Sequence, residues 1–162
     1  MAAVDYFLKI DGIDGESQDA KHKGSLQIHT YNFGASQRGA HAAGGGGGSG
    51  KAHLQDFSFV MLANKATPKL FLACCNGDHI PKAVLTCRKA GKDQQEYLKV
   101  TLTDLLVSSV QSGGPHKGEV MPYDSVTVNF ARIEIEYKEQ KADGSLHGSI
   151  KTGWCLKSNK KV

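Results

Sequence analysis

The sequence lacks the residue patterns that usually identify a catalytic or metal site. Its four cysteines have neither the C-x-x-C spacing of a redox pair nor the spacing of a zinc site. No G-x-S-x-G or H-E-x-x-H motif occurs, and the seven histidines are spread without ligand spacing. We therefore predict no catalytic residue, no cofactor and no metal site, and we interpret the adjacent Cys74 and Cys75 as small apolar side chains of a helix.

Long apolar runs and a strong excess of positive or negative charge are also missing. No apolar stretch follows Met1, because the charged Asp5 comes almost at once, and no segment is apolar enough to span a membrane. The net charge of +4 is scattered, and no aromatic residues interleave with the lysines near the end of the chain, Lys157, Lys160 and Lys161. We therefore expect folding in a reducing cytoplasm, export only by a machine that reads no Sec-type signal, no membrane insertion and no nucleic-acid partner.

The most informative pattern that is present lies in residues 96–137. The first half of this segment alternates, with Leu98, Val100 and Leu102 on one side, which is typical of a strand packed on one face. The second half alternates too, but its apolar positions change from even to odd numbers near Phe130. A change of one residue in the alternation moves the apolar set to the opposite face of a strand.

Two explanations of this change remain open from the sequence. Either a bulge lies near Phe130, or one long strand serves the domain core first and a second apolar contact afterwards. Strands usually have about 5–6 residues, so a run of this length is expected to extend past its own domain core. We predict that Ile133, Ile135 and Tyr137 contact another subunit.

Shorter alternating segments predict the remaining strands. They lie at residues 4–10, 25–33, 53–60, 83–89 and 149–156. Together with the two halves of the long segment they predict one mainly β domain, residues 1–162. The expected fold is an antiparallel β-barrel or sandwich of about seven strands with one short flanking α-helix.

The helix is predicted over residues 67–77. Thr67 is the expected N-cap, Pro68 suits the first helical position, and Gly77 can close the end. Phe71, Cys74 and Cys75 share one face at the spacing i, i+3 and i+4, so we expect this face to pack against the sheet.

A glycine-rich segment occupies residues 34–51. Its last part formally matches the phosphate-binding motif G-x-x-x-x-G-K. Ala52, however, stands where a Ser or Thr hydroxyl would hold magnesium, and the following residues alternate like a strand, so no helix N-terminus is available for a phosphate. The better hypothesis is a long loop that becomes ordered only against a neighbouring molecule.

Several short segments occur in a characteristic order along the whole chain: residues 12–17 with Asp19 and His22, 58–59, 66–70, 97–98, 105–110, 129–131 and 153–154. The Gly-Glu-Ser turn, the Thr-Pro-Lys-Leu helix start and the Leu-Val-Ser-Ser-Val strand are specific in combination, although each alone is weak. In this combination the chain resembles the haemolysin-coregulated protein (Hcp) family of bacterial type VI secretion systems.

The resemblance implies a β-barrel with a flanking helix, related to the tail-tube proteins of contractile phages. Proteins of this kind form homohexameric rings that stack into a hollow tube, which leaves the cell when a sheath contracts. The implied partners are further copies of the chain, effector proteins held in the lumen, and the spike and sheath proteins of the same system. The implied route leads from the cytoplasm to the outside or into a target cell without a cleaved signal peptide.

Two segments are our candidates for roles in such a tube. If Tyr31 and Phe33 enter the barrel core, Thr30 and Asn32 project the other way, either into the channel or onto an ordinary solvated face. The glycine-rich loop is the candidate for reaching an adjacent ring, and ordering it costs entropy, so stacking is expected to be weak in isolation. Its residues are Gly44, Gly45, Gly46, Gly47, Gly48, Ser49 and Gly50.

Two other classes of function remain as alternatives. A β-sandwich module that binds a small ligand or glycan predicts a monomer or dimer with a formed pocket. A phosphate-loop nucleotidase predicts magnesium-dependent nucleotide binding that is abolished by substitution of Lys51.

Overall fold

The computed structural model describes residues 4–39, 51–91, 94–114 and 121–162 of the chain. The described residues are mainly antiparallel β structure with one helix, which confirms the predicted fold class. In chain order the elements are β1 (Val4–Ile10), β2 (Leu26–Ile28), β3 (Thr30–Asn32), β4 (Ala35–Ser36), β5 (His53–Leu54), β6 (Phe57–Leu62), α1 (Thr67–Asn76), β7 (Ile80–Lys89), β8 (Glu96–Gly113), β9 (Tyr123–Gln140), β10 (Leu146–Cys155) and β11 (Lys160–Lys161).

The structure divides two segments that the sequence predicted as single strands. Residues 25–33 contain β2 and β3, separated by His29, and residues 53–60 contain β5 and the start of β6. The backbone of His29 still belongs to the sheet, because its N–H donates to the carbonyl of Val60 at 2.8 Å. The predicted number of strands was therefore too low, whereas the positions of the strand segments were right.

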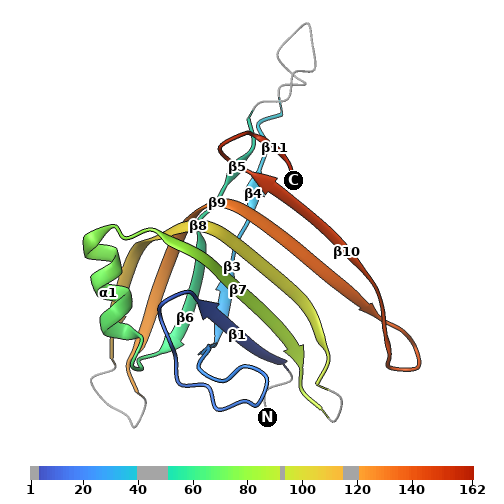
Figure 1. The fold of residues 1–162 in the computed structure, drawn as a ribbon, viewed down its shortest axis with the longest axis horizontal. Helices are drawn as coiled ribbons and strands as arrows, with labels where there is room; N and C mark the ends of the chain where they lie inside the picture. The colour runs from blue at the N-terminus through green and yellow to red at the C-terminus, as the bar shows by residue number, and fades with distance from the viewer. Residues whose placement is uncertain (1–3, 40–50, 92–93, 115–120) are drawn as a thin grey trace, which may run out of the picture.

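Strand pairing closes the larger sheet into a barrel (Figure 1). β1 pairs with β7, β7 with β8, β8 with β9, β9 with β6, and β6 with β3. β3 continues from β2 across a single residue, and β2 pairs with β1, so the circuit is complete. The interior is filled by side chains from alternate strand positions, of which the largest fully buried ones include Phe7, Phe57, Phe59, Met61 and Leu102.

The two longest strands, β8 and β9, have 18 residues each and pair along most of their length. Both change the parity of their buried residues at the same level. In β8 the buried positions pass from Leu102 to Leu105, and Asp104 between them has a φ of 52°. In β9 they pass from Phe130 to Ile133.

The paired change keeps the apolar side chains of both strands in one core. Leu105 pairs with Phe130 and Leu102 with Ile133, so the register of the two strands is the same on both sides of Asp104. A residue with positive φ can reverse the alternation locally without shifting the pairing. The sequence offered a bulge near Phe130 as one explanation. The register shift lies instead in β8, between Val107 and Ser109.

Helix α1 has the predicted bounds but not the predicted cap. Its N-cap is Ala66, and no side chain caps it. The hydroxyl of Thr67 instead accepts the N–H of Asn64 at 3.0 Å and donates to the carboxylate of Asp124 at 2.5 Å. Gly77 ends the helix in the left-handed region, with a φ of 64°, as predicted.

The buried face of α1 also differs from the prediction. The helix packs on the sheet through Leu70 and Ala73, whereas Phe71 is 60% exposed and Cys75 is exposed. Only Cys74, which is partly buried, agrees with the expected face. Because the chain enters the helix from a buried Ala66, the residues four and seven positions later continue on the buried side.

A buried arginine holds the turn between β1 and β2 against the barrel. Arg88 of β7 is 3% exposed and donates to both carboxylate oxygens of Asp19, at 3.0 and 2.9 Å, and to Asp5 at 3.3 Å. Its guanidinium lies 4.7 Å from the centre of the Phe7 ring. Hydrogen bonds from Arg88 favour the ionised carboxylate and lower the pKa of Asp19 to about 2.

Strand β10 lies outside the barrel (Figure 1). Its inner edge pairs with the second half of β9, while on the outer edge only Trp154 and Cys155 pair with β11. Residues 147–152 are exposed. Among the described strands, the outer edge of β10 therefore has no partner along most of its length.

Candidate functional site

Short polar side chains form a strip across the face of β3, β6, β9 and β8 that points away from the core. Thr30 and Asn32 are exposed, while Tyr31 between them packs against the core. Asn32 pairs with Ser58 of β6, and Ser58 pairs with Thr127 of β9. Paired residues project to the same side of a sheet, so these side chains share one face. We call Thr30, Asn32, Ser58, Ser108 and Thr127 the polar strip.

Asp56 anchors one end of the polar strip. One of its carboxylate oxygens accepts from the hydroxyl of Ser108 at 2.8 Å, and the other accepts from the side-chain amide of Asn129 at 2.9 Å. The hydroxyl of Thr127 lies 2.7 Å from the hydroxyls of both Ser108 and Ser109. The strip is thus a surface of small polar groups held in place by one another, which can exchange hydrogen bonds with a polypeptide lying on it.

The structure confirms the alternation predicted for residues 30–33. Tyr31 and Phe33 pack against the core, and Thr30 and Asn32 are exposed on the other face. That Thr30 and Asn32 line a channel remains a prediction. The sequence did not identify Asp56, whose role depends on partners 52 and 73 residues away.

A second candidate surface lies where β10 extends beyond the barrel. Ile150 is 72% exposed and pairs with Tyr137, which is 47% exposed. Tyr137 also pairs with Leu98 of β8, and its ring lies 6.4 Å from that of Tyr97 in an edge-on arrangement. We call Tyr137 and Ile150 the β10 ledge. It is an apolar surface at the end of the sheet, next to the outer edge of β10, which is largely unpaired among the described strands.

One residue of the predicted subunit contact, Ile133, is buried within its own chain. Ile133 is 5% exposed and belongs to the core of its own chain, so it has almost no surface left for another subunit. Ile135 is partly buried against the core, and only Tyr137 is largely exposed. The reason is the paired change of parity in β8 and β9, which returns Ile133 to the same core as Phe130. A contact through Tyr137 remains a prediction.

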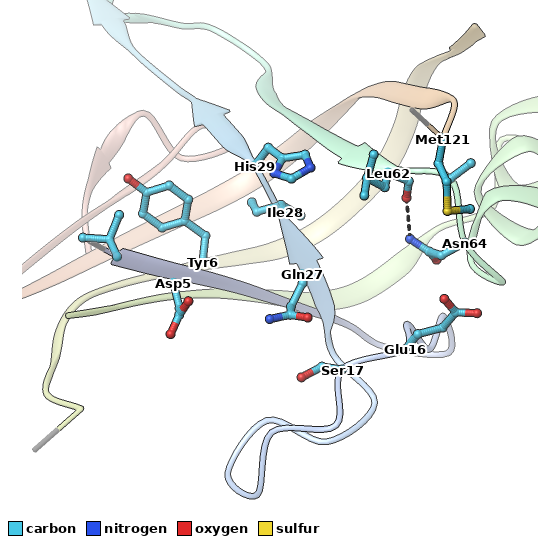
Figure 2. Close-up of a pocket in the computed structure, with 12 residues that line it drawn as sticks. Asp5, Tyr6, Glu16, Ser17, Gln27, Ile28, His29, Leu62, Asn64 and Met121 are labelled. Atoms are coloured by element: carbon cyan, nitrogen blue, oxygen red, sulfur yellow. Dashed lines mark hydrogen bonds between the residues drawn. The ribbon is translucent and has the colours of Figure 1, made fainter. Parts of the chain in front are cut away.

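A cavity of about 720 Å³ opens beside β2 (Figure 2). Figure 2 shows Tyr6, Gln27 and His29 on the strand side of this cavity and Asn64 and Met121 on the opposite side. The ring of Tyr6 makes an edge contact with Tyr31, with centroids 5.1 Å apart, so this wall is fixed by packing. The ligand-binding alternative would use this cavity, whose lining includes no residue of the polar strip or the β10 ledge.

The predicted stacking loop, residues 44–50, lies outside the described residues. The described chain on either side of it forms β4 and β5, which pair with each other in a small sheet of their own. Lys51 is exposed, and β5 begins at His53. A strand therefore follows the phosphate-loop motif where a nucleotide-binding loop would need the start of a helix.

No group of three or more His, Cys, Asp or Glu side chains in the described ranges is arranged to hold a metal ion. No helix in the same ranges has both the length and the apolar character that crossing a membrane requires.

Comparisons with known proteins agree along nearly the whole chain. A family model described as "Type VI secretion system effector, Hcp" matches residues 7–137. Protein hcp1 of Pseudomonas aeruginosa is 46% identical over 159 residues, which cover 97% of this chain and 98% of that protein. The crystal structure of Hcp1 from Salmonella typhimurium, 37% identical, has a TM-score of 0.80 over 99% of this chain and 100% of that chain.

A further solved structure, described as that of a type six secretion system protein, has a TM-score of 0.94 at 28% identity, covering 99% of this chain and 100% of that chain. The match therefore includes β10 and the turn held by Arg88 as well as the barrel. It confirms the resemblance carried by the short sequence segments. This chain belongs to the Hcp family of type VI secretion system proteins.

Proposed function

We propose that this chain is a structural subunit of the inner tube of a type VI secretion system. It assembles into hexameric rings, the rings stack into a hollow tube, and the tube is exported on sheath contraction with effector proteins in its lumen. The single observation that carries the proposal is a closed barrel from which β10 extends with the exposed apolar side chain of Ile150. Membership of the Hcp family supports the same function.

Ring formation follows from what the closed barrel leaves exposed. Within the barrel the strand edges are paired, so the barrel itself needs no partner. The β10 ledge is different, because burying a large aliphatic side chain such as Ile150 stabilises a contact by about 1.5–3 kcal/mol. One interface with a neighbouring copy would bury the β10 ledge and also supply hydrogen-bond partners to the outer edge of β10.

Stacking requires a different kind of contact. A top-to-bottom contact joins two different surfaces of the subunit, so it does not close and grows into a filament. The glycine-rich loop, residues 44–50, is our candidate for this contact, since it lies in sequence between β4 and β5, which pair in a small sheet separate from the barrel sheet. Its ordering on contact costs entropy, so tubes are expected to be less stable than the rings.

Negative-stain microscopy of the purified protein, together with native mass spectrometry, tests the proposal. We expect rings with a central hole and a mass of six chains. A monomer or dimer at all concentrations would favour the ligand-binding alternative, for which the cavity beside β2 is the specific supporting observation. Export is tested separately by detecting the full-length chain, with its N-terminus intact, outside cells that have a functional contractile sheath.

Replacing Gly45, Gly46, Gly47 and Gly48 with alanine is expected to reduce the stacking of rings and to leave single rings intact. Alanine restricts the backbone conformations from which the loop selects its bound form. Filament length in electron micrographs is the measurement. The control changes Gly113 and Gly114 to alanine, where an added Cβ meets no atom closer than 3.5 Å. Loss of the rings themselves in the loop variant would contradict the assignment of the loop to stacking.

Replacing Asn32 with tryptophan is expected to lower the amount of effector that copurifies with the ring, without changing ring mass. The bulky ring would cover neighbouring groups of the polar strip, such as Ser58 and Thr30, and displace a polypeptide lying on them. The control is tryptophan at Lys82, an exposed position on β7. Equal effector recovery from the Asn32 variant and from wild type would show that the polar strip does not line the proposed lumen.

A further inference from the structure

Helix α1 carries an apolar stripe on the face directed away from the sheet. The stripe consists of Pro68, Phe71, Leu72 and Cys75, which follow the spacing i, i+3, i+4 and i+7 of one helix face. All four are exposed, Phe71 by 60% and Leu72 by 58%. Figure 1 shows α1 at the periphery of the molecule, beside β8 and β9, so this face is open to a partner.

The charges at the two ends of α1 are opposite to those that a helix favours. Lys65 precedes the N-cap Ala66, and Asp78 follows the C-cap Gly77. A helix carries partial positive charge at its N-terminus and partial negative charge at its C-terminus, so a cation and an anion in this order are unfavourable. Both side chains are exposed, and neither takes part in an ion pair within the described residues.

The stripe and the two flanking charges have the same centre in the sequence. The midpoint of α1 lies between Phe71 and Leu72, and Lys65 and Asp78 are equally far from it in sequence, whereas the exposed Lys69 of the first turn has no charged counterpart at Cys74. Pro68 and Cys75 are also equidistant from this midpoint. A two-fold axis through it would therefore map each end of the surface onto the other.

We propose that α1 forms an isologous contact with α1 of a second copy of this chain, the two helices packing antiparallel. In this arrangement Phe71 of each copy faces Leu72 of the other, and Lys65 of each copy faces Asp78 of the other. The two helix dipoles are then antiparallel, and each charge lies near an opposite charge. A partner that was acidic throughout would offset the unfavourable charge of Lys65 but would repel Asp78 at the other end of the helix.

One pair of α1 helices forms only a weak contact, whereas several pairs that act together hold two assemblies more strongly. A ten-residue helix is about 15 Å long. One pair of such helices therefore buries less surface than a stable interface requires, which is about 1,000 Å². Several copies fixed on one ring raise the effective concentration of each further contact. Because a two-fold contact does not relate neighbouring subunits of one ring, this contact would join copies that belong to separate assemblies. Its geometry is independent of the proposed ring, although its strength rests on it.

Sedimentation velocity over a wide range of protein concentration tests the contact. Wild type is expected to associate beyond its basic oligomer, or to dimerise if it is a monomer. Lys65→Asp and Asp78→Lys are each expected to shift this association to about five- to tenfold higher concentration, because each places like charges opposite one another twice per contact. The double variant, which exchanges the two charges, should restore association. Lys23→Asp, an exposed lysine on the β1–β2 turn, is the charge-matched control.

Three results would overturn the proposal. One is the absence of concentration-dependent association in wild type, and another is a double variant as weak as the single ones. The third is binding of wild type to acidic proteins or to vesicles of anionic lipid that Asp78→Lys strengthens, since that would identify a uniformly negative partner. Native mass spectrometry of the same samples reports ring formation separately, so failure of the ring and failure of the helix contact are distinguishable.

Discussion

Replacing Ile150 with aspartate is expected to abolish ring assembly and leave a folded single chain. Ile150 is the most exposed large apolar residue among the described residues and lies on β10, whose outer edge has no partner along most of its length among the described strands. A carboxylate buried in an apolar contact without a partner costs several kcal/mol, so the dissociation constant between protomers should rise by at least about a hundredfold. Native mass spectrometry at several concentrations measures the change.

The control for this variant is Ser149→Asp. Ser149 is the neighbouring exposed residue of β10 and projects to the opposite side of the strand. It introduces the same charge on the face that the proposed contact does not use, so its rings should persist. If Ile150→Asp and wild type form rings over the same concentration range, the β10 ledge is not the contact between subunits.

Replacing Arg88 with leucine is expected to destabilise the folded chain by about 2–4 kcal/mol, even though leucine suits a buried position. The substitution leaves Asp5 and Asp19 without the cation that lies between them, and it removes the guanidinium packed on the Phe7 ring. Urea denaturation monitored by circular dichroism gives the free energy of unfolding. Arg132→Leu is the matched control, because the side chains of Arg132 and Glu134 are much more exposed (42% and 24%) than that of Arg88 (3%), and such a partly exposed ion pair is worth about 1 kcal/mol or less.

The pH dependence of this difference identifies its cause. The folded-state pKa of Asp19 is about 2, below the value of about 4 expected for an unfolded aspartate. The stabilisation from the ionised carboxylate is therefore complete above about pH 4 and is lost as the pH falls toward 2. The free-energy difference between wild type and Arg88→Leu should shrink over this range. A constant difference would show that packing on Phe7, and not the ion pairs, is responsible.

The sequence predicted those elements whose pattern is local. The alternation in residues 4–10 and 96–103 was enough to locate β1 and the first half of β8. Likewise Pro68 and Gly77 marked α1 to within a residue. In each case the residues that form the sequence pattern belong to the strand or helix that the pattern predicts, or lie next to it.

Features that depend on distant partners were missed or misassigned. Arg88 is buried because it binds Asp19 and Asp5, which are 69 and 83 residues away in sequence. Ile150 is the one large apolar residue between Leu146 and Trp154 of β10, and only its pairing with Tyr137 reveals the β10 ledge. The exposed face of Phe71 followed from where the chain enters α1, which helical spacing alone does not determine.

The separation of β10 from the closed barrel has a practical consequence for how variants of this protein are screened. Residues 147–152 are exposed in a lone chain, so most substitutions there should leave the stability of the single folded chain unchanged. A selection for soluble expression would accept such variants as intact even when they no longer assemble. Only an assay of particle size would separate them from wild type.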